Sequence, residues 1–265
     1  MTRYVVHRGG AALWPENTLL AFRNAIALGA QTLEFDVHAT ADADVAVIHD
    51  PTVDRMTDGT GPVASFTVAE LHRLRVKAAD GRLTDEWVPT LDEVLALAAP
   101  AGVALLVEIK TPGAAVVYAR EDGAVTATPG ARYPGLEARV LERLRVAGAI
   151  DRALLMAFNP AVVAEVRALA PRQMTALLVD RGHVESAGAG PAEPVAWAAA
   201  AGVNVLGMHY SLCDASTVAA ARAAGVMLAV FTVNEEADMR RLAALGVDAI
   251  ISDRAELVMR MQGAG

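Results

Sequence analysis

Residues 214–232 read DASTVAAARAAGVMLAVFT, and this stretch contains the unit from which the chain is built. Its alanine-rich part favours a helix, and Gly225 suits the left-handed position that ends one. The apolar run after the glycine is typical of a buried parallel strand. The same junction of an alanine or leucine, a glycine and an apolar run recurs at residues 28–30, 101–103, 147–149, 201–203 and 245–247. This alternation predicts right-handed βαβ units around a parallel sheet.

Extending this unit along the chain predicts eight strands and eight helices. The expected strands are residues 3–8, 32–38, 103–110, 152–158, 174–179, 203–208, 226–232 and 249–253. The expected helices are residues 18–28, 91–98, 136–147, 160–169, 193–200, 214–223, 235–244 and 254–261. Eight such units predict a (β/α)₈ (TIM) barrel. An open doubly wound sheet is the alternative, but the first turn lacks the G-x-G-x-x-G fingerprint of dinucleotide-binding sheets.

Length and composition narrow the class of protein. The 265 residues carry a net charge of −8 and are 54% hydrophobic, which excludes a disordered chain and disfavours a nucleic-acid binder. The single cysteine, Cys213, excludes an internal disulfide framework, and we expect it to be an inert thiol. The apolar runs are too short to span a membrane, and the first residues run directly into a strand. We therefore expect one catalytic domain over residues 1–265, located in the cytoplasm.

Two long segments interrupt the regular alternation. Residues 39–90 contain an extra strand from Val45 to His49 and a helical segment from Thr67 to Val76. Residues 111–135 are rich in Gly, Pro, Ala and Thr. Both segments follow barrel strands, so both are expected over the C-terminal face, where the active sites of such barrels lie.

Polar residues at the ends of the apolar strands mark a candidate site. Glu34 and Asp36 are two residues apart on one strand, as are Glu108 and Lys110 on the next, so each pair projects to one face. The full set expected to converge at the barrel mouth is His7, Arg8, Glu34, Asp36, His49, Glu108 and Lys110. Lys110 is notable because the chain has only one other lysine, Lys77, against 21 arginines.

The types of residue in this set point to phosphodiester chemistry. Three converging carboxylates repel one another unless a hard divalent cation binds them, and oxygen ligands favour Mg²⁺ or Ca²⁺. A guanidinium and an ammonium beside that ion suit a phosphate. Two histidines supply an acid and a base near neutral pH. Together they indicate metal-assisted cleavage of a phosphodiester.

Six motifs in order extend this interpretation, and with them the sequence resembles the glycerophosphodiester phosphodiesterase family nearly end to end. They are His7-Arg8-Gly9 with Pro15-Glu16-Asn17-Thr18; Glu34-Phe35-Asp36-Val37; Thr40 to Asp44 with His49-Asp50; Val107-Glu108-Ile109-Lys110; Phe231-Thr232-Val233-Asn234; and Gly246-Val247-Asp248 with Ser252-Asp253. The resemblance implies a barrel with a small insertion after the second strand, here roughly residues 50–90. It also implies hydrolysis of glycerophosphodiesters to sn-glycerol 3-phosphate and an alcohol, either directly by water or through a cyclic phosphate.

The resemblance also implies a role for individual residues. His7 and His49 correspond to the general acid/base pair, and Glu34, Asp36 and Glu108 to the ligands of Mg²⁺ or Ca²⁺. Arg8 and Lys110 correspond to phosphate contacts, and Phe231 and Asn234 to further substrate contacts. Phe231 departs from the family pattern, which commonly has tryptophan there, and so keeps an aromatic wall without an indole N–H.

Some residues near the motifs have less specific interpretations. Asn17 is expected to be a helix N-cap, and the role of His209 stays open. His38, His72 and His183 are expected to be exposed or incidental.

Three other functions compete with the glycerophosphodiesterase. A lysophospholipase D or sphingomyelinase D-like enzyme shares the His, Glu and Asp pattern, but would favour an apolar collar and secretion. A Schiff-base aldolase using Lys110 needs an uncharged amine, which neighbouring carboxylates disfavour. A non-catalytic binding protein would not need every motif residue. We expect a small-molecule glycerophosphodiester as partner; the sequence leaves open the alcohol, the choice of metal, and whether the chain is a monomer or a homo-oligomer.

Overall fold

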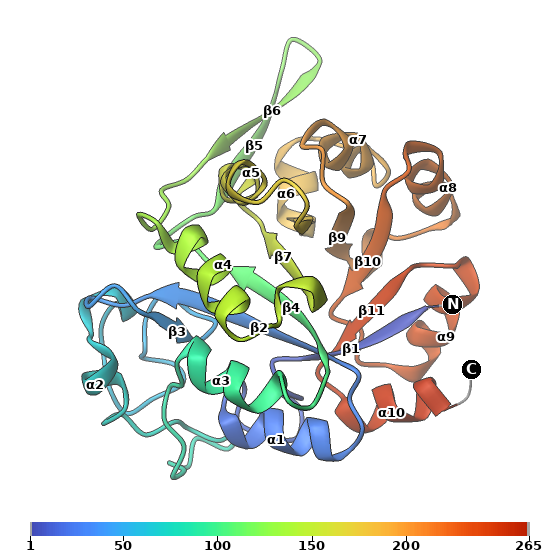
Figure 1. The fold of residues 1–265 in the computed structure, drawn as a ribbon. Coiled ribbons are helices and arrows are strands. Elements are labelled where there is room, and N and C mark those ends of the chain that lie inside the picture. The colour runs from blue at the N-terminus through green and yellow to red at the C-terminus, as the bar shows by residue number, and fades with distance from the viewer. Residues whose placement is uncertain (1, 264–265) are drawn as a thin grey trace.

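The computed structural model describes residues 2–263 and contains a closed barrel of eight parallel strands (Figure 1). Strand β1 pairs with both β2 and β11, which closes the barrel. The bounds are β1 (Arg3–His7), β2 (Thr32–Ala39), β4 (Ala104–Ile109), β7 (Ala153–Ala157), β8 (Met174–Val179), β9 (Val205–His209), β10 (Met227–Phe231) and β11 (Ala249–Ser252). The predicted TIM barrel is confirmed, and the strand ends differ from prediction by at most two residues.

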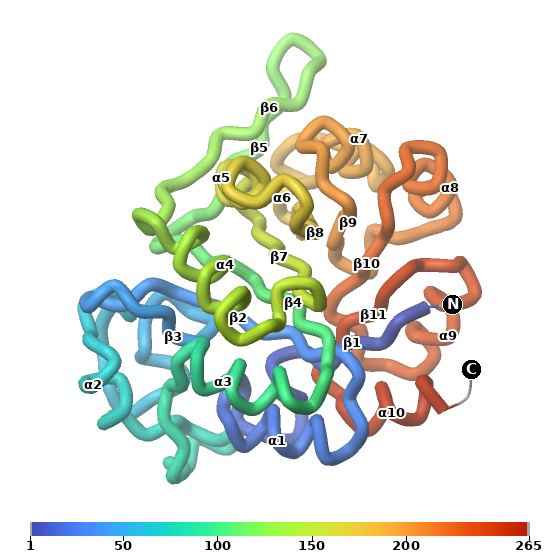
Figure 2. The backbone as a smooth tube through the Cα atoms, viewed as in Figure 1, coloured from blue at the N-terminus to red at the C-terminus, as the bar shows by residue number. Residues whose placement is uncertain are grey.

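One helix follows each barrel strand and covers its outer side, as the tube in Figure 2 shows. These helices are α1 (Leu19–Ala27), α3 (Leu91–Ala98), α4 (Leu136–Val146), α5 (Pro160–Leu169), α7 (Glu193–Ala200), α8 (Ala215–Ala224), α9 (Glu236–Leu245) and α10 (Ala255–Gly263). The main core lies between strands and helices, and a smaller apolar cluster that includes Met156, Leu178 and Val205 fills the barrel interior. None of the helices formed by residues 2–263 is long and apolar enough to cross a membrane.

The N-cap of α1 corrects one expectation. Thr18, not Asn17, caps this helix, because the Thr18 hydroxyl accepts the Ala21 N–H while Asn17 takes a left-handed conformation with φ 58°. That conformation turns the Asn17 amide into the barrel mouth, where it donates to Asp36. A second difference is the short helix α6 (Arg181–Ser186), which begins at the Asp180 cap and was not expected from the sequence.

The segment between β2 and α3 forms a small lobe with its own apolar core. It contains β3 (Val45–Val47), antiparallel to β2, the 3₁₀ turn η1 (Val63–Ser65) and the one-turn helix α2 (Val68–Leu71). The lobe core consists of Ala46, Ile48, Val53, Val63, Leu71, Val76 and Val88. The predicted helix over 67–76 is therefore too long: Val76 instead donates its N–H to the Glu86 carbonyl, which extends the chain there. The predicted strand from Val45 to His49 is shorter as well and ends at Val47.

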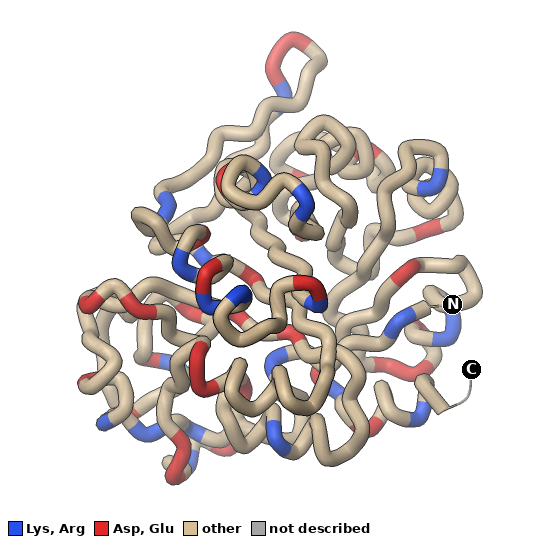
Figure 3. The backbone as a smooth tube through the Cα atoms, in the orientation of Figure 1, with Lys and Arg blue, Asp and Glu red and all other residues tan. Residues whose placement is uncertain are grey.

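The segment after β4 forms a hairpin that the sequence analysis did not predict. Strands β5 (Val116–Glu121) and β6 (Ala124–Pro129) project beyond the barrel, joined by Asp122-Gly123, both with positive φ (Figure 1). Tyr118 stacks on Trp197 of α7 with the ring centroids 4.5 Å apart. Figure 3 shows acidic and basic residues interleaved over the outer elements, and acidic residues at the hairpin tip.

A prediction concerns Gly9, which lies directly after His7-Arg8. Its φ is +78°, and a Cβ there would lie 2.8 Å from the Ala21 Cβ of α1. Gly9→Ala should therefore lower the free energy of unfolding by about 2–4 kcal/mol, from left-handed strain plus the clash with α1. In a chain of this length that corresponds to a melting temperature lower by roughly 5–15 °C, measured by calorimetry.

The matched control for Gly9 is Gly102→Ala. Gly102 also has a positive φ, +70°, but a Cβ there meets no atom within 4 Å. Gly102→Ala should lower the free energy of unfolding only by the backbone strain, about 1–2 kcal/mol. Equal destabilisation by the two substitutions would contradict the close approach of α1 to Gly9.

Candidate active site at the C-terminal mouth of the barrel

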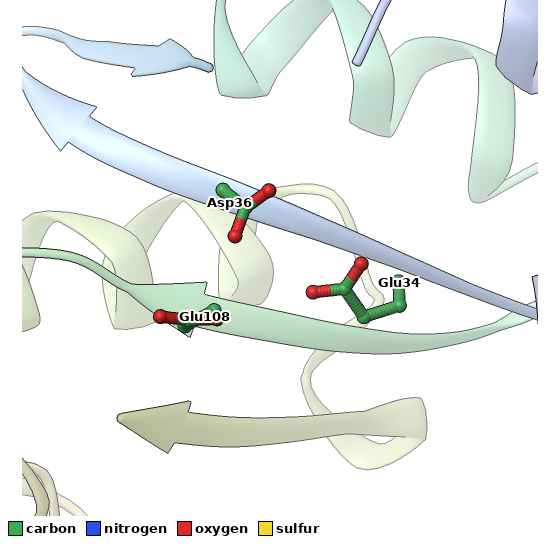
Figure 4. A group of neighbouring side chains, drawn as sticks. All are labelled: Glu34, Asp36 and Glu108. Carbon is green, nitrogen blue, oxygen red and sulfur yellow. The ribbon is translucent and has the colours of Figure 1, made fainter. Parts of the chain in front are cut away.

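Three buried carboxylates meet where β2 and β4 end. Asp36 and Glu108 are register neighbours on these strands, and Glu34 lies two residues before Asp36 on the same face. Each residue offers a carboxylate oxygen, and these oxygens all lie within 4.8 Å of one another (Figure 4). We call this group the carboxylate triad. The sequence-based expectation that these side chains converge is confirmed.

Two cationic side chains contact the triad, but their two positive charges do not neutralise its three carboxylates. The Lys110 Nζ lies 2.6 Å from a Glu108 oxygen and 3.0 Å from Asp36 Oδ1, and the Arg8 Nε lies 3.3 Å from Asp36 Oδ2. Both contacts to Asp36 have the distance of an ion pair without the alignment of a hydrogen bond. Asp36 does accept a hydrogen bond from the Asn17 amide at 2.9 Å.

The pKa values of the triad show this imbalance. Burial and the neighbouring Asp36 raise the pKa of Glu34 well above its usual range. Burial likewise raises the pKa of Glu108 to about 7, despite the Lys110 ammonium. Burial opposes ionisation of Asp36 as well, but Lys110 and Arg8 together hold its pKa well below its usual range. The triad therefore favours additional positive charge, and its hard oxygen donors are the ligands that Mg²⁺ and Ca²⁺ prefer.

His7 is held by a carboxylate that directly follows the neighbouring strand β11. Its Nδ1 lies 2.6 Å from Asp253 Oδ1, and its Nε2 lies 3.6 Å from Glu34. A carboxylate only accepts hydrogen bonds, so Nδ1 carries the proton and Nε2 of the neutral ring is left as a proton acceptor. Asn234 donates to the other Asp253 oxygen at 2.8 Å and accepts the Asp253 N–H. Asn234 thus orients the partner of His7.

His49, which lines the same pocket as His7, has the same arrangement. Its Nδ1 lies 2.7 Å from Asp50 Oδ1, and Arg55 donates to Asp50 Oδ2 at 2.6 Å. Hydrogen bonds from Arg55 and His49 lower the pKa of Asp50 to about 2 against the opposing effect of burial. Burial, supported by Lys110 and Arg8, lowers the pKa of His49. Two histidines with carboxylate-fixed Nδ1 atoms therefore flank the triad.

One arginine of the lobe connects the two sides of the site. Arg55 also donates to Glu16 Oε1 at 2.7 Å, and Glu16 Oε1 accepts from Arg8 at 3.2 Å. The chain of contacts thus runs from His49 through Asp50, Arg55 and Glu16 to Arg8. We call it the Arg55 clamp.

The expectation that His38 is exposed or incidental is wrong. It is 1% exposed, its Nε2 lies 3.0 Å from the His49 carbonyl, and its Nδ1 lies 2.9 Å from the Tyr133 hydroxyl. The carbonyl can only accept, so His38 donates through Nε2 and accepts through Nδ1. Burial lowers its pKa to about 4, which keeps the ring neutral. His183 and His72 are half-buried, and His183 packs against Phe158.

Two hollows open beside the triad. The larger, about 320 Å³, is lined by His7, Arg8, Glu34, His49, Glu108, Met156, Phe158, Leu178, Asp180, His209, Phe231, Thr232 and Ile251. The smaller, about 180 Å³, is lined by His38, His49, Pro51, Glu108, Ile109, Lys110, Thr111, Gly113, Ala115, Phe158 and Asn159. Phe231 and His209 therefore face the larger pocket, whereas Asn234 is not among its lining residues. A roomier hollow of about 810 Å³ lies at the opposite end of the barrel, away from the carboxylates and histidines.

The residues that orient the two histidines carry little signal in the sequence. Asp50, Asp253 and Glu16 lie inside the motifs without a predicted role, and Arg55 lies in none of the motifs. A signal was present for Asp50 alone, because it directly follows His49. Asp253 lies 246 positions from His7, so only closure of the barrel brings the two together.

Known proteins share this architecture along its whole length. Residues 7–257 match the model of the glycerophosphoryl diester phosphodiesterase family. A glycerophosphodiester phosphodiesterase of Caldanaerobacter subterraneus is 32% identical over 100% of this chain and 99% of its own. A solved glycerophosphodiester phosphodiesterase of Agrobacterium tumefaciens superposes with a TM-score of 0.76 at 26% identity, covering 98% of this chain and 100% of the other.

A second solved relative carries a ligand. A phosphodiesterase of Oleispira antarctica, in complex with the product sn-glycerol-3-phosphate, has a TM-score of 0.76 at 25% identity, with 100% and 96% of the two chains covered. The family match, the full-length relative and the common fold agree with the motifs of the sequence. The chain therefore belongs to the glycerophosphoryl diester phosphodiesterase family and is a phosphoric diester hydrolase.

Proposed function

We propose that this enzyme hydrolyses water-soluble glycerophosphodiesters to sn-glycerol 3-phosphate and an alcohol, with a divalent metal ion and a histidine pair. The observation that carries the proposal is the carboxylate triad flanked by two histidines, each with its Nδ1 bound to a carboxylate. The sn-glycerol-3-phosphate held by the Oleispira relative supports the proposed product. We also propose that the chain acts as one catalytic domain in the cytoplasm, without nucleic-acid partners.

Glu34, Asp36 and Glu108 would hold the metal. The fit rests on their chemistry: three buried carboxylates face two cations, and two of the three pKa values are raised. A bound Mg²⁺ or Ca²⁺ would supply Lewis acidity to a phosphate oxygen and offset the charge of the triad.

The two histidines would move the protons. His7, whose Nε2 is free to accept, takes the proton of the attacking oxygen, whether that oxygen belongs to water or to the glycerol 2-hydroxyl. His49, when its ring is charged and carries a proton on Nε2 as well, gives that proton to the departing alcohol oxygen. The Asp253 and Asp50 carboxylates hold each ring in orientation and stabilise its charged form, as in other His–Asp pairs.

Arg8 and Lys110 would contact the phosphate. Burial opposes the charge on Lys110, but Asp36 and Glu108 outweigh it and raise the pKa of the ammonium above its usual value. A permanently charged ammonium suits a phosphate and not an imine-forming nucleophile. This geometry disfavours the Schiff-base aldolase.

The experiment that tests the function measures release of sn-glycerol 3-phosphate from glycerophosphocholine. Protein treated with EDTA should be inactive and recover on addition of Mg²⁺ or Ca²⁺. Full activity after chelation would refute the requirement for a metal ion. Faster turnover of lysophosphatidylcholine than of glycerophosphocholine would favour the lysophospholipase D alternative.

Metal affinity is predicted to depend on pH. The pKa of Glu108 is raised to about 7, so in the metal-free protein this group is increasingly protonated as the pH falls below 7. A metal must displace that proton, so its dissociation constant should rise by up to about tenfold for each pH unit below 7. The gain in melting temperature on adding Mg²⁺ should therefore be larger at pH 8 than at pH 5.5, as measured by thermal scans with and without EDTA. An equal gain at both pH values would contradict the prediction.

Arg55 is not one of the proposed reacting groups, but the Arg55 clamp predicts that replacing it lowers activity. Arg55→Met removes the contacts to Asp50 and Glu16, so His49 and Arg8 lose their orientation. We expect kcat to fall about 10- to 100-fold, the usual effect of losing such supporting contacts. The matched control is Arg75→Met in the same lobe, where the lost ion pair is with the exposed Asp85, and kcat should stay within about twofold of wild type. Equal effects of the two variants on kcat would show that the clamp has no positioning role.

A further inference from the structure

His49 lies just beyond the end of a regular strand. Strand β3 ends at Val47, and the chain continues through His49 and Asp50 to Pro51, which has no N–H to donate. Among residues 2–263, the main-chain groups of His49 and Asp50 make a single hydrogen bond, which the His49 carbonyl accepts. The sheet therefore does not fix this stretch, although it carries the proposed proton donor.

The donor of that hydrogen bond is the ring of the buried His38. On β2, His38 shares one face with Glu34 and Asp36. Its Nε2 lies 3.0 Å from the His49 carbonyl, which belongs to the peptide that joins His49 to Asp50. The same peptide connects the His49 ring to the carboxylate that lies 2.7 Å from its Nδ1. One hydrogen bond thus fixes the link between the histidine and its carboxylate partner.

Tyr133 determines which nitrogen of His38 carries the proton. Its hydroxyl lies 2.9 Å from Nδ1, and the two rings meet edge to face with their centroids 5.6 Å apart. Burial raises the pKa of Tyr133 to about 12, so the hydroxyl keeps its proton and donates a hydrogen bond to Nδ1. The proton of the neutral His38 ring is therefore on Nε2, where it faces the His49 carbonyl.

We propose that His38 and Tyr133 are positioning residues, which hold the main chain of His49 so that its ring can protonate the departing alcohol. This inference rests on the proposed function. In that step the phosphorus–oxygen bond to the alcohol breaks, and the proton on the His49 Nε2 goes to the departing oxygen. Neither ring nitrogen of His38 is free to contact the substrate, because one donates to His49 and the other accepts from Tyr133. The pair therefore acts only through His49.

Such a role differs measurably from that of a histidine that only stabilises the core. Loss of a core residue lowers the amount of folded enzyme and so affects all substrates alike. Loss of a residue that acts through His49 affects only substrates whose leaving group needs a proton. Choline needs one, whereas p-nitrophenolate is a stable anion that leaves without it.

Substitutions of His38 test the hydrogen bond to His49. His38→Leu removes the donor and keeps an apolar side chain, and kcat for glycerophosphocholine should fall about 10- to 100-fold, the usual effect of losing an orienting partner. KM should change by no more than about twofold, because the residues that contact the substrate remain. His38→Gln keeps an N–H group near the position of Nε2, so kcat should recover to within about fivefold of wild type.

Tyr133→Phe removes only a hydroxyl, so the His38 ring stays but its tautomer is no longer fixed. The loss of one hydrogen bond should lower kcat by about three- to tenfold. In a His38→Leu background it should cause no further loss, since Tyr133 acts through His38. The matched control is Tyr118→Phe. The Tyr118 hydroxyl is buried without a hydrogen-bond partner among the described residues, so its removal should leave kcat within about twofold of wild type.

The deciding experiment compares two diesters of sn-glycerol 3-phosphate, one with choline and one with p-nitrophenol. In His38→Leu and Tyr133→Phe, kcat should fall as stated for the choline diester but by no more than about twofold for the p-nitrophenyl diester. His49→Ala should show the same difference between the diesters, with a larger loss. The gain in melting temperature on adding Mg²⁺ should match that of the wild type, because neither His38 nor Tyr133 donates to the carboxylate triad.

Each outcome decides the proposed role. Equal losses on both diesters, a lost response to Mg²⁺ or wild-type rates in His38→Leu would overturn the positioning role and leave the hydrolase function standing. Equal losses on both diesters in His49→Ala would refute His49 as the proton donor, and the inference with it. A wild-type enzyme that hydrolyses neither diester would refute the proposed function as a whole. If His38→Leu does not fold, Tyr133→Phe and Tyr118→Phe on the two diesters carry the decision.

Discussion

His7→Ala is expected to lower kcat/KM for glycerophosphocholine by about 10³-fold or more, at the upper end of what general acid–base catalysis contributes. The substitution removes the Nε2 atom that faces Glu34 and leaves Asp253 without its partner. Asp253→Asn keeps His7, but its amide oxygen would accept from Asn234, so its NH2 group would face Nδ1 and favour the wrong tautomer. This variant should also reduce kcat strongly. Release of sn-glycerol 3-phosphate measures both effects.

The control for His7 is a histidine outside the site. His72→Ala removes a ring that lies 3.2 Å from Glu93 and packs against Trp87 in the lobe. Its kcat/KM should stay within about twofold of the wild-type value, since His72 lines neither hollow of the site. A His7→Ala enzyme with more than a tenth of the wild-type activity would refute the proposed role of His7. Circular dichroism of each variant checks that the fold is intact.

Glu34→Gln is expected to separate stability from activity. The pKa of Glu34 is raised by burial and by Asp36, so its ionised form is disfavoured in the metal-free barrel. A neutral isostere relieves that repulsion, and the variant in EDTA should melt at or above the temperature of the wild type in EDTA. Loss of this proposed metal ligand should nevertheless reduce hydrolysis by about 10³-fold or more and abolish the rise in melting temperature with Mg²⁺.

A buried carboxylate elsewhere in the barrel provides the comparison for Glu34. Glu137 of α4 is 2% exposed and accepts a hydrogen bond from Arg132 at 2.9 Å. Glu137→Gln should lower the melting temperature, because a buried ion pair loses one partner. It should leave the activity and the response to Mg²⁺ unchanged. The prediction fails if Glu34→Gln destabilises the metal-free protein or keeps its response to Mg²⁺.

Local periodicity made part of the site predictable. Side chains alternate along a strand, so Glu34 and Asp36 had to share a face wherever β2 lay in the barrel. Glu108 joined them because β4 is the next barrel strand and Asp36 pairs with it in register. The irregular segments were harder to interpret, because their elements depend on non-local contacts. The hairpin of residues 116–129 is stabilised by stacking on Trp197, which no local pattern reveals.

The sequence by itself determined the alternation of helices and strands and the residues of the triad, because these depend on residue type, on spacing within each strand and on the order of the strands. It indicated the proposed histidine pair through the motifs. Only the tertiary structure decided which side chains form hydrogen bonds with one another in the site. Closure of the barrel brings Asp253 within hydrogen-bonding distance of His7. Folding of the lobe puts Arg55 between Asp50 and Glu16, to both of which it donates. The tertiary structure also brought the His38 ring into hydrogen-bonding distance of the His49 carbonyl. The reason is physical: a hydrogen bond depends on two side chains meeting within about 3 Å at a suitable angle. When the partners are far apart in the chain, packing of the whole barrel sets that meeting.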